Sequence, residues 1–221
     1  MQNKDKVALF DFCETIANFQ TADAFVRYVQ SHSKPTNKDL IFLFSLLNKL
    51  HVFSVFRRLF PKANLEKKLL LKQLKGRSQE DLLRLAEGYY NEVIKVNLIE
   101  EVICELRRLQ NNGYSCYVVS AGYDVYLSYF CNEYKIDGLI STRIEFKKGI
   151  CTGSCVGKDC MYEQKIYNIK ATLTGNFSKW FAFTDSITDL PMLELVGYPI
   201  VVSKRISQQW AEKKNYKQII W

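Results

Sequence analysis

Short apolar runs alternate with helix-like segments along much of the chain. The runs are nearly continuous and rich in β-branched or aromatic residues, which is typical of strands buried on both faces. They cover residues 7–10, 116–119, 139–144, 180–183 and 198–202. Residues 98–113 form an amphipathic pattern that ends at Gly113, and residues 189–195 predict a helix with Pro191 in its first turn. This alternation predicts an α/β core with a doubly wound, Rossmann-like parallel sheet.

A second pattern fills residues 20–95. Its apolar stretches, within residues 40–60, 67–76 and 78–90, are helical in composition and show no strand alternation. An all-helical insertion after the first strand would form a cap over the sheet edge. We therefore expect a core domain from residues 1–19 and 96–221 and a helical cap domain from residues 20–95.

Three of the predicted strands end on a polar residue that can do chemistry: Asp11, Ser120 and Asp185. Ligands of open α/β sheets bind at the carboxyl ends of the strands, so we expect these side chains to meet in one crevice. Each residue taken alone is more often part of a turn or a helix cap. The inference of a common site depends on all three residues being placed at the ends of predicted strands.

Charge and cysteine content narrow the possible partners and the compartment. The net charge of +8 suits anionic ligands, but the basic residues form no dense block, so a solvated basic surface is the simpler interpretation. Nucleic-acid binding has no further support and is not expected. The first residues lack the features of a secretory signal, and the seven cysteines follow no disulfide spacing. These features predict reduced thiols and a cytoplasmic protein.

Four segments resemble, in the right order, the motifs of the haloacid dehalogenase superfamily. VALFDFCETI resembles its first motif, usually D-x-D-x-T, with Asp11 in first place. YVVSAG, CMYEQKIYNI and FTDSITDLPML place Ser120, Lys165, Asp185 and Asp189 at further motif positions. The hairpin-like EFKKGICTGSC before the lysine, together with the helical cap, resembles the phosphoserine phosphatase-like branch of subfamily IB.

The resemblance implies a magnesium-dependent phosphatase-type hydrolase of a small phosphorylated metabolite. Asp11 would be the nucleophile that forms an aspartyl-phosphate, which divides a difficult hydrolysis into two easier steps. Mg²⁺ would bind to the carboxylates of Asp11 and Asp185, the main-chain carbonyl of Cys13, and water. Asp189 would complete or orient this acidic cluster.

The resemblance also implies a site for the phosphoryl group. Ser120 and the backbone amides of Ala121 and Gly122, leading into a helix, would bind the phosphoryl oxygens. Lys165 would offset the negative charge of the nucleophile and the phosphate.

One position departs from the family pattern. The second aspartate of the first motif, which serves as general acid and base in related phosphatases, is Cys13 here. A thiol is a poor replacement, and loss of such a group costs roughly a hundred- to ten-thousand-fold in rate. The chain is then a slow phosphatase, a hydrolase of esters whose leaving group needs no proton, or a catalytically weak ligand-binding or regulatory protein on the same fold. Glu14, where Gly is common, could compensate.

Three cysteines lie close together in the sequence and raise the question of a metal site. Cys151, Cys155 and Cys160 could suggest zinc, but both histidines, His32 and His51, are distant in sequence, so ordinary thiols are favoured.

The apolar run 40–60 is interrupted by charges, and two packed cap helices explain it most simply. The alternative is a cap that touches a membrane surface, with Arg57 and Arg58 near the headgroups, in a peripheral lipid-phosphate phosphatase. The oligomeric state is left open.

Overall fold

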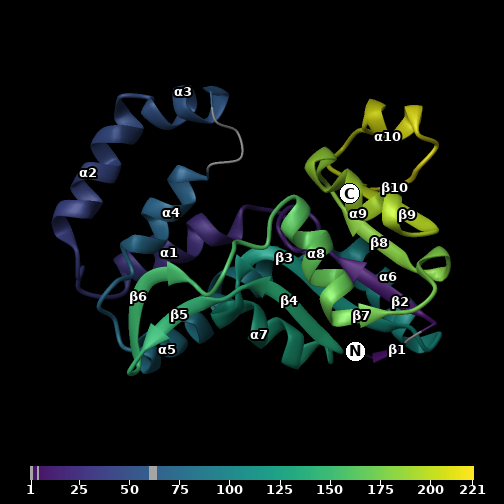
Figure 1. Cartoon of the computed structure of the whole chain (residues 1–221), viewed down its shortest axis with the longest axis horizontal. Coiled ribbons are helices and arrows are strands. Elements are labelled where there is room, and N and C mark those ends of the chain that lie inside the picture. The colour runs from purple at the N-terminus through teal and green to yellow at the C-terminus, as the bar shows by residue number, and fades with distance from the viewer. Residues whose placement is uncertain (1, 4, 60–63) are drawn as a thin grey trace.

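A six-stranded parallel sheet forms the centre of the protein (Figure 1). The structure is a computed structural model that describes residues 2–3, 5–59 and 64–221. The strands are β2 (Val7–Phe10), β3 (Ser115–Tyr123), β4 (Gly138–Thr142), β8 (Phe181–Thr184), β9 (Tyr198–Ser203) and β10 (Lys217–Ile220). Their order is β10-β9-β8-β2-β3-β4, so the chain fills one side of β2 before it crosses to the other. The winding direction reverses between β2 and β8, where doubly wound sheets bind ligands.

Helices cover both faces of this sheet. They are α6 (Glu100–Asn111), α7 (Asp124–Glu133), α8 (Glu163–Thr172), α9 (Leu190–Leu195) and α10 (Gln209–Lys213). Alternate side chains of β2 point to opposite faces, as the strand geometry requires. Ala8 and Phe10 pack in one buried cluster with α6 and α7. Val7 and Leu9 pack in a second cluster with α8 and α9. The predicted doubly wound α/β fold is confirmed.

Every regular element between β2 and α6 is helical in the part of the chain that the structure describes. These elements are α1 (Thr21–Ser31), α2 (Lys38–Lys49), α3 (Val52–Leu59), α4 (Leu65–Lys72), α5 (Gln79–Tyr89), a π-helical turn η1 (Tyr90–Ile94) and a 3-10 turn η2 (Lys95–Asn97). Buried apolar residues of α1, α4 and α5 belong to the same cluster as Phe10 of the sheet. In contrast, α2 and α3 extend away from the sheet (Figure 1).

The apolar run 40–60 forms two separate helices. It divides into α2 and α3 around His51, whose φ of 55° lies in the left-handed region, and Phe60 lies outside the described residues. No helix among the described residues has the length and apolar content needed to cross a bilayer.

An antiparallel hairpin, β5 (Ile144–Lys147) and β6 (Ile150–Cys155), attaches to these helices. The amide of Gly76 donates to the carbonyl of Cys151 at 2.9 Å, and the amide of Cys151 donates to the carbonyl of Arg77 at 2.8 Å. The hairpin therefore lies beside α4 and α5 (Figure 1). The remaining short elements are β1 (Gln2–Asn3), β7 (Leu173–Thr174), η3 (Phe177–Lys179) and η4 (Ile187–Asp189).

Two predicted strands end two or more residues from the expected position. The predicted strand 139–144 is wrong at its end, because β4 stops at Thr142 and Ile144 begins the hairpin. The amide of Ile144 donates to the carboxylate of Asp124 at 3.0 Å, which holds this turn in place. Strand β3 continues past Ser120 to Tyr123, and its pairing with β4 shifts register between these two residues.

Candidate active site

Two carboxylates lie side by side at the switch point of the sheet. Asp11 follows β2 directly, and its amide donates to the carbonyl of Phe183 on β8 at 2.9 Å. Asp185 follows β8. Both residues line a pocket of about 170 Å³, together with side chains from the loop after β2, β3, the start of α8 and the loop after β8. The lining includes Cys13, Glu14, Gln20, Ser120, Ala121, Lys165 and Asp189. The structure thus brings together the residues that the motifs singled out, except Gly122, which lines the adjacent pocket.

A buried lysine connects two of the carboxylates. Lys165 lies in the first turn of α8, and its Nζ lies 2.9 Å from Asp11 Oδ1 and also contacts Asp189 Oδ2. Thr184 donates to the same Asp189 oxygen at 3.0 Å. Burial lowers the pKa of Lys165, but the charges of Asp11 and Asp189 raise it more, so the amine stays protonated. Lys165 therefore offsets the negative charge of Asp11 and Asp189.

Asp185 has no such cationic partner in the part of the chain that the structure describes. Among the residues whose side chains the structure describes, no lysine or arginine forms an ion pair with this carboxylate. Burial, together with the charges of Asp11 and Glu14, raises the pKa of Asp185 to about 7. Burial also raises the pKa of Asp11 to about 6, against the lowering effect of Lys165. A cation between the two carboxylates would relieve this repulsion.

The available donors suit a hard cation. Carboxylate and carbonyl oxygens are the ligands that Mg²⁺ prefers, and Mg²⁺ is usually held by one or two carboxylates with water and phosphate oxygens. Asp11 and Asp185 supply the two carboxylates. The described residues contain no group of three or more His, Cys, Asp or Glu side chains placed to hold a metal. An all-protein cage, including a zinc site at the three clustered cysteines, is therefore not found there.

Thr15 connects the loops that carry Asp11 and Asp185, and it was not among the predicted site residues. Its buried hydroxyl donates to Asp185 Oδ1 at 3.2 Å and lies 3.5 Å from Asp11 Oδ2. The amide of Asp185 donates to the same hydroxyl oxygen at 3.0 Å. The final T of the D-x-D-x-T pattern was the signal that could have identified this residue.

Cys13 has its thiol in a hydrogen-bonded chain that leads away from the pocket. Its Sγ lies 3.1 Å from the hydroxyl of Thr21, which lies 2.9 Å from the hydroxyl of Tyr126. Tyr89 donates to the carbonyl of Thr21 at 2.8 Å. Burial and the charge of Asp11 raise the pKa of the Cys13 thiol, so it remains neutral and is a weak proton donor.

Glu14 occupies a backbone position that favours glycine. Its φ of 55° lies in the left-handed region, which costs a residue with a side chain about 1–2 kcal/mol. Gln20 donates from its side-chain amide to the Glu14 carboxylate at 2.6 Å. This contact keeps a carboxylate at the pocket wall, close enough to Asp185 to raise the pKa of that residue.

The end of β3 from Ser120 to Tyr123 differs from the predicted phosphate cradle. The amide of Gly122 donates to Ser120 Oγ at 3.0 Å, so this amide is already occupied. Helix α7 begins only at Asp124. A Cβ atom at Gly122 would lie 2.7 Å from the Tyr126 hydroxyl oxygen, which explains the glycine. Ser120 Oγ accepts this bond, so its own proton can be donated to another acceptor.

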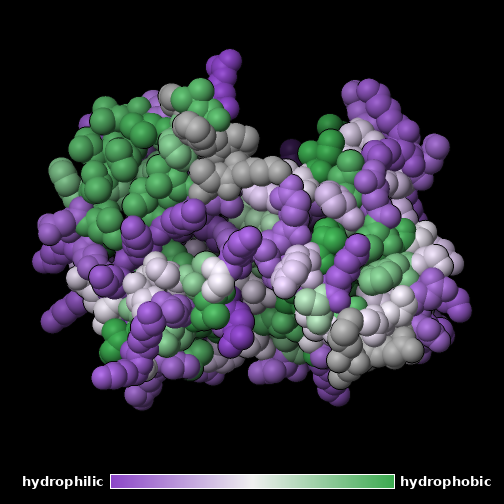
Figure 2. Space-filling view, viewed as in Figure 1, coloured by the Kyte–Doolittle hydropathy of each residue, from purple (hydrophilic) through white to green (hydrophobic). Residues whose placement is uncertain are grey.

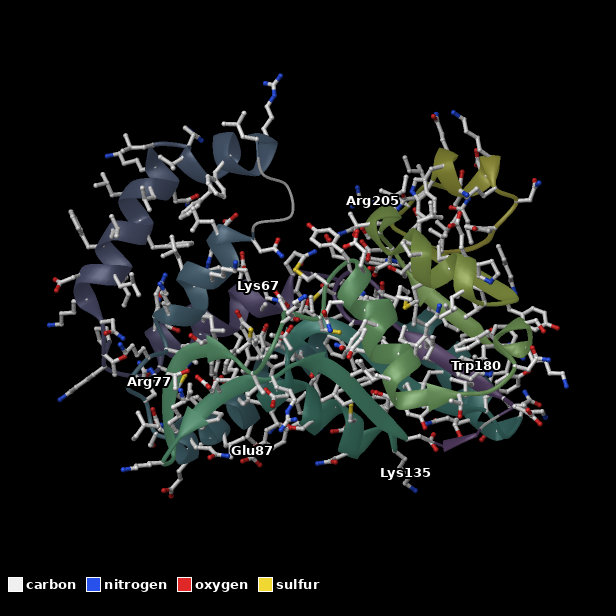
Figure 3. All side chains as sticks on the ribbon, in the orientation of Figure 1. Lys67, Arg77, Glu87, Lys135, Trp180 and Arg205 are labelled. Carbon is white, nitrogen blue, oxygen red and sulfur yellow. The ribbon has the colours of Figure 1, made fainter. Side chains whose placement is uncertain are left out.

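A larger pocket of about 550 Å³ adjoins the first one, on the side of the helical segment between β2 and α6 (residues 21–97). Phe53 and Phe56 of α3 and Leu65 of α4 give it an apolar wall. Lys67 of α4 also lines it, and its Nζ lies 2.5 Å from the carbonyl oxygen of Ala121 and 2.6 Å from Asp159 Oδ1. Figure 3 shows Lys67 between the helical segment and the core. The two pockets share Cys13, Gln20, Ala121, Met161 and Tyr162.

Comparisons with known proteins show a family and a fold that this chain shares. Residues 8–194 match a family model described as haloacid dehalogenase-like hydrolase. The chain is 26% identical over 230 residues to the phosphoserine phosphatase of Methanocaldococcus jannaschii, covering 100% of this chain and 98% of that protein. A protein of unknown function from Bordetella pertussis Tohama I has a similar structure, with a TM-score of 0.80 at 19% identity, covering 98% of this chain and 99% of that one. A phosphoserine phosphatase in its apo form has a TM-score of 0.62 at 20% identity, covering 98% and 94%. The two structural likenesses concern the fold alone.

Proposed function

The chain belongs to the haloacid dehalogenase-like hydrolase family, and we propose that it hydrolyses phosphate monoesters of small molecules with Asp11 as nucleophile. The observation that carries this proposal is the buried Asp11–Lys165 ion pair beside the carboxylate of Asp185, which has no cationic partner among the described residues. The division into a core (1–19 and 96–221) and a cap (20–95), the roles of the site residues and a cytoplasmic location belong to the same proposal.

Each residue of the site has its own role in the proposed reaction. Ser120 donates to a phosphoryl oxygen, and Lys165 keeps a positive charge beside Asp11 as the carboxylate attacks phosphorus. The bond between phosphorus and the leaving oxygen breaks, and the alcohol part departs as an anion that takes its proton from water. A second water then attacks the aspartyl-phosphate, which releases phosphate and restores the Asp11 carboxylate. Asp11 and Asp185, with the carbonyl of Cys13, would hold Mg²⁺, which supplies charge stabilisation for the transferred phosphoryl group.

The two pockets differ in size, and each would hold a different part of the substrate. The smaller pocket, of about 170 Å³, holds the residues proposed for the phosphoryl group. The larger one, of about 550 Å³, has room for the organic part of the ester, with an apolar wall at Phe53 and Phe56. Lys67 is positioned to meet polar or anionic groups of that part.

One observation favours a second candidate, a catalytically weak binding protein on the same fold. The thiol of Cys13 is neutral and is hydrogen-bonded to Thr21, so it offers neither the acid nor the base of related phosphatases. An enzyme with this residue is expected to favour esters whose leaving group needs little protonation.

A panel of phosphate esters assayed with and without Mg²⁺ tests the proposal. We expect Mg²⁺-dependent release of phosphate from an aryl phosphate, and its loss in Asp11→Asn, which keeps the shape of the side chain without its charge. If the wild-type protein and Asp11→Asn release phosphate equally, Asp11 is not the nucleophile. If neither releases any while metal and phosphate still bind, the binding-protein interpretation holds.

A further inference from the structure

Helix α2 is apolar on two opposite faces, and only one of them is covered. The inner residues Leu40, Ile41, Phe44 and Leu47 are half-buried, and α2 packs against α3 and α4. The rings of Phe44 and Phe53 of α3 lie 4.9 Å apart between centroids. No residue of α2 is fully buried. An exposed apolar face on a helix whose opposite apolar face is already packed marks a contact with protein or lipid.

The outer face of α2 carries Phe42, Leu43 and Leu46, and Leu50 at the end of the helix continues it. Phe42 is 71% exposed and Leu50 is 61% exposed, although both are large apolar side chains. Residues 42, 46 and 50 follow each other at helical spacing, so they lie on one stripe. Figure 2 shows the resulting gathering of hydrophobic residues over α2 and α3.

The charges around this face indicate what covers it. Exposed Lys38 lies four residues before Phe42, and exposed Lys49 lies three residues after Leu46, so both lysines border one side of the stripe. Asp39, three residues before Phe42, lies at the beginning of the stripe itself. In the sequence, residues 34–62 contain six lysines and arginines and a single acid, Asp39, which gives +5 of the net charge of +8. Lysine is depleted in protein–protein interfaces, whereas helices that lie in a membrane interface carry lysine and arginine beside their apolar face.

We propose that the outer face of α2 docks the protein on an anionic lipid bilayer. Phe42, Leu46 and Leu50 enter the boundary between headgroups and acyl chains, and Lys38 and Lys49 extend toward lipid phosphates. The 12 residues of α2 are too few to span a bilayer, so the helix lies in the plane of the surface. The substrate itself need not be a lipid, because this face is separate from the residues that line the two pockets.

Sedimentation of the full chain with vesicles tests this proposal. We expect binding to phosphatidylcholine vesicles that contain phosphatidylglycerol, weaker binding at high salt, and little binding to phosphatidylcholine alone. The double variant Phe42→Ser/Leu46→Ser should lower the partition coefficient by about tenfold per side chain. Lys38→Gln/Lys49→Gln should lower it by about fivefold per lysine on the anionic vesicles only. Val96→Ser, which changes another exposed apolar residue, is the matched control and should bind like the wild-type protein.

Two further measurements separate the possible failures. Hydrolysis of a soluble aryl phosphate by Phe42→Ser/Leu46→Ser should equal that of the wild-type protein, which shows that the fold and the pocket are intact. The proposal is overturned if the wild-type protein ignores anionic vesicles at low salt, or if both double variants bind them as tightly as it does. It is also overturned if the wild-type protein self-associates without vesicles and Phe42→Ser/Leu46→Ser is monomeric, because a second copy would then cover α2.

Discussion

The hydroxyl of Thr15 and the loop at Asp185 form a reciprocal pair of hydrogen bonds. Thr15 donates to Asp185 Oδ1 at 3.2 Å, and the Asp185 amide donates back to the Thr15 oxygen at 3.0 Å. The two residues are 170 positions apart in the chain. Thr15 thus fixes the orientation of the carboxylate that has no cationic partner among the described residues.

Removal of this hydroxyl should weaken both the fold and the metal site. In Thr15→Val, the Asp185 amide loses its acceptor, so the free energy of unfolding should fall by about 1–3 kcal/mol. Chemical denaturation measures this loss, and titration calorimetry measures the accompanying loss of Mg²⁺ affinity. Thr15→Ser restores the hydroxyl and should recover most of both. Thr172→Val at an exposed position should change stability by less than about 0.5 kcal/mol. Equal effects of the valine and serine variants would contradict a role for the hydroxyl.

Mg²⁺ should stabilise the folded protein through Asp185. Binding to the native state alone raises stability by about 2.7 kcal/mol at a hundredfold excess over Kd. The rise in melting temperature on addition of Mg²⁺ should disappear in Asp185→Asn, which keeps the shape and the acceptor for Thr15. Asp39→Asn on α2 lies outside both pockets and should retain the full rise. A full rise in Asp185→Asn would place the metal elsewhere.

The metal-free protein should lose stability as the pH rises. Burial raises the pKa of Asp11 to about 6 and that of Asp185 to about 7, above the ordinary value of 3.8, so the native state binds more protons than the unfolded one between pH 4 and 7. Stability from these groups is therefore fully present below about pH 4 and is lost progressively as the pH rises to about 7. Denaturation in EDTA at several pH values measures this trend. The difference between wild type and Asp185→Asn isolates one carboxyl, and Asp185→Asn should be the more stable at pH 8.

Cys13→Asp should supply the missing general acid. Turnover of an alkyl phosphate should rise by roughly a hundred- to ten-thousand-fold, because its leaving oxygen needs a proton. Turnover of an aryl phosphate should rise less, since that leaving group departs as an anion. Steady-state kinetics on both esters separates proton donation from other effects, and Cys13→Asn is the control without an acid. An equal gain on both esters, or an equal gain with asparagine, would rule out this explanation.

Lys67→Met should loosen the contact between α4 and the core. The variant keeps an apolar stem of similar length but loses the bonds to the Ala121 carbonyl and to Asp159. A charge-assisted hydrogen bond contributes about 1.5–3 kcal/mol, so we expect KM for phosphate esters to rise by about tenfold or more. Lys68→Met, at the exposed neighbouring position, should leave KM unchanged. An unchanged KM in Lys67→Met would show that this contact does not shape the substrate pocket.

The sequence was sufficient to predict five of the six strands of the sheet and the convergence of Asp11 and Asp185 at one edge. Val7–Phe10 is a continuous apolar run, and its four residues are fully buried as expected for a central parallel strand. Asp11 and Asp185 meet because parallel strands present their carboxyl ends at one edge. For these features, the pattern of apolar residues was enough to predict where the strands lie and where they end.

Other features depend on contacts that a sequence pattern does not contain. β10 (Lys217–Ile220) is short and only half-buried, so it carries too few apolar positions to be recognised. The extension of β3 past Ser120 results from a register shift against β4. The hydrogen bond between Thr15 and Asp185, like that between Lys67 and Ala121, joins distant segments and arises only when they pack together.

The packing of Phe44 on Phe53 has a thermodynamic consequence for the whole helical segment. Phe53 forms part of the wall of the larger pocket, and Phe44 belongs to α2, whose other face is open to the surroundings. A compound that shifts Phe53 on entering the pocket must therefore alter the packing of α2. Coupling between two binding events is reciprocal. A partner that binds the outer face of α2 therefore changes the affinity for that compound by the same factor as the compound changes the affinity for the partner.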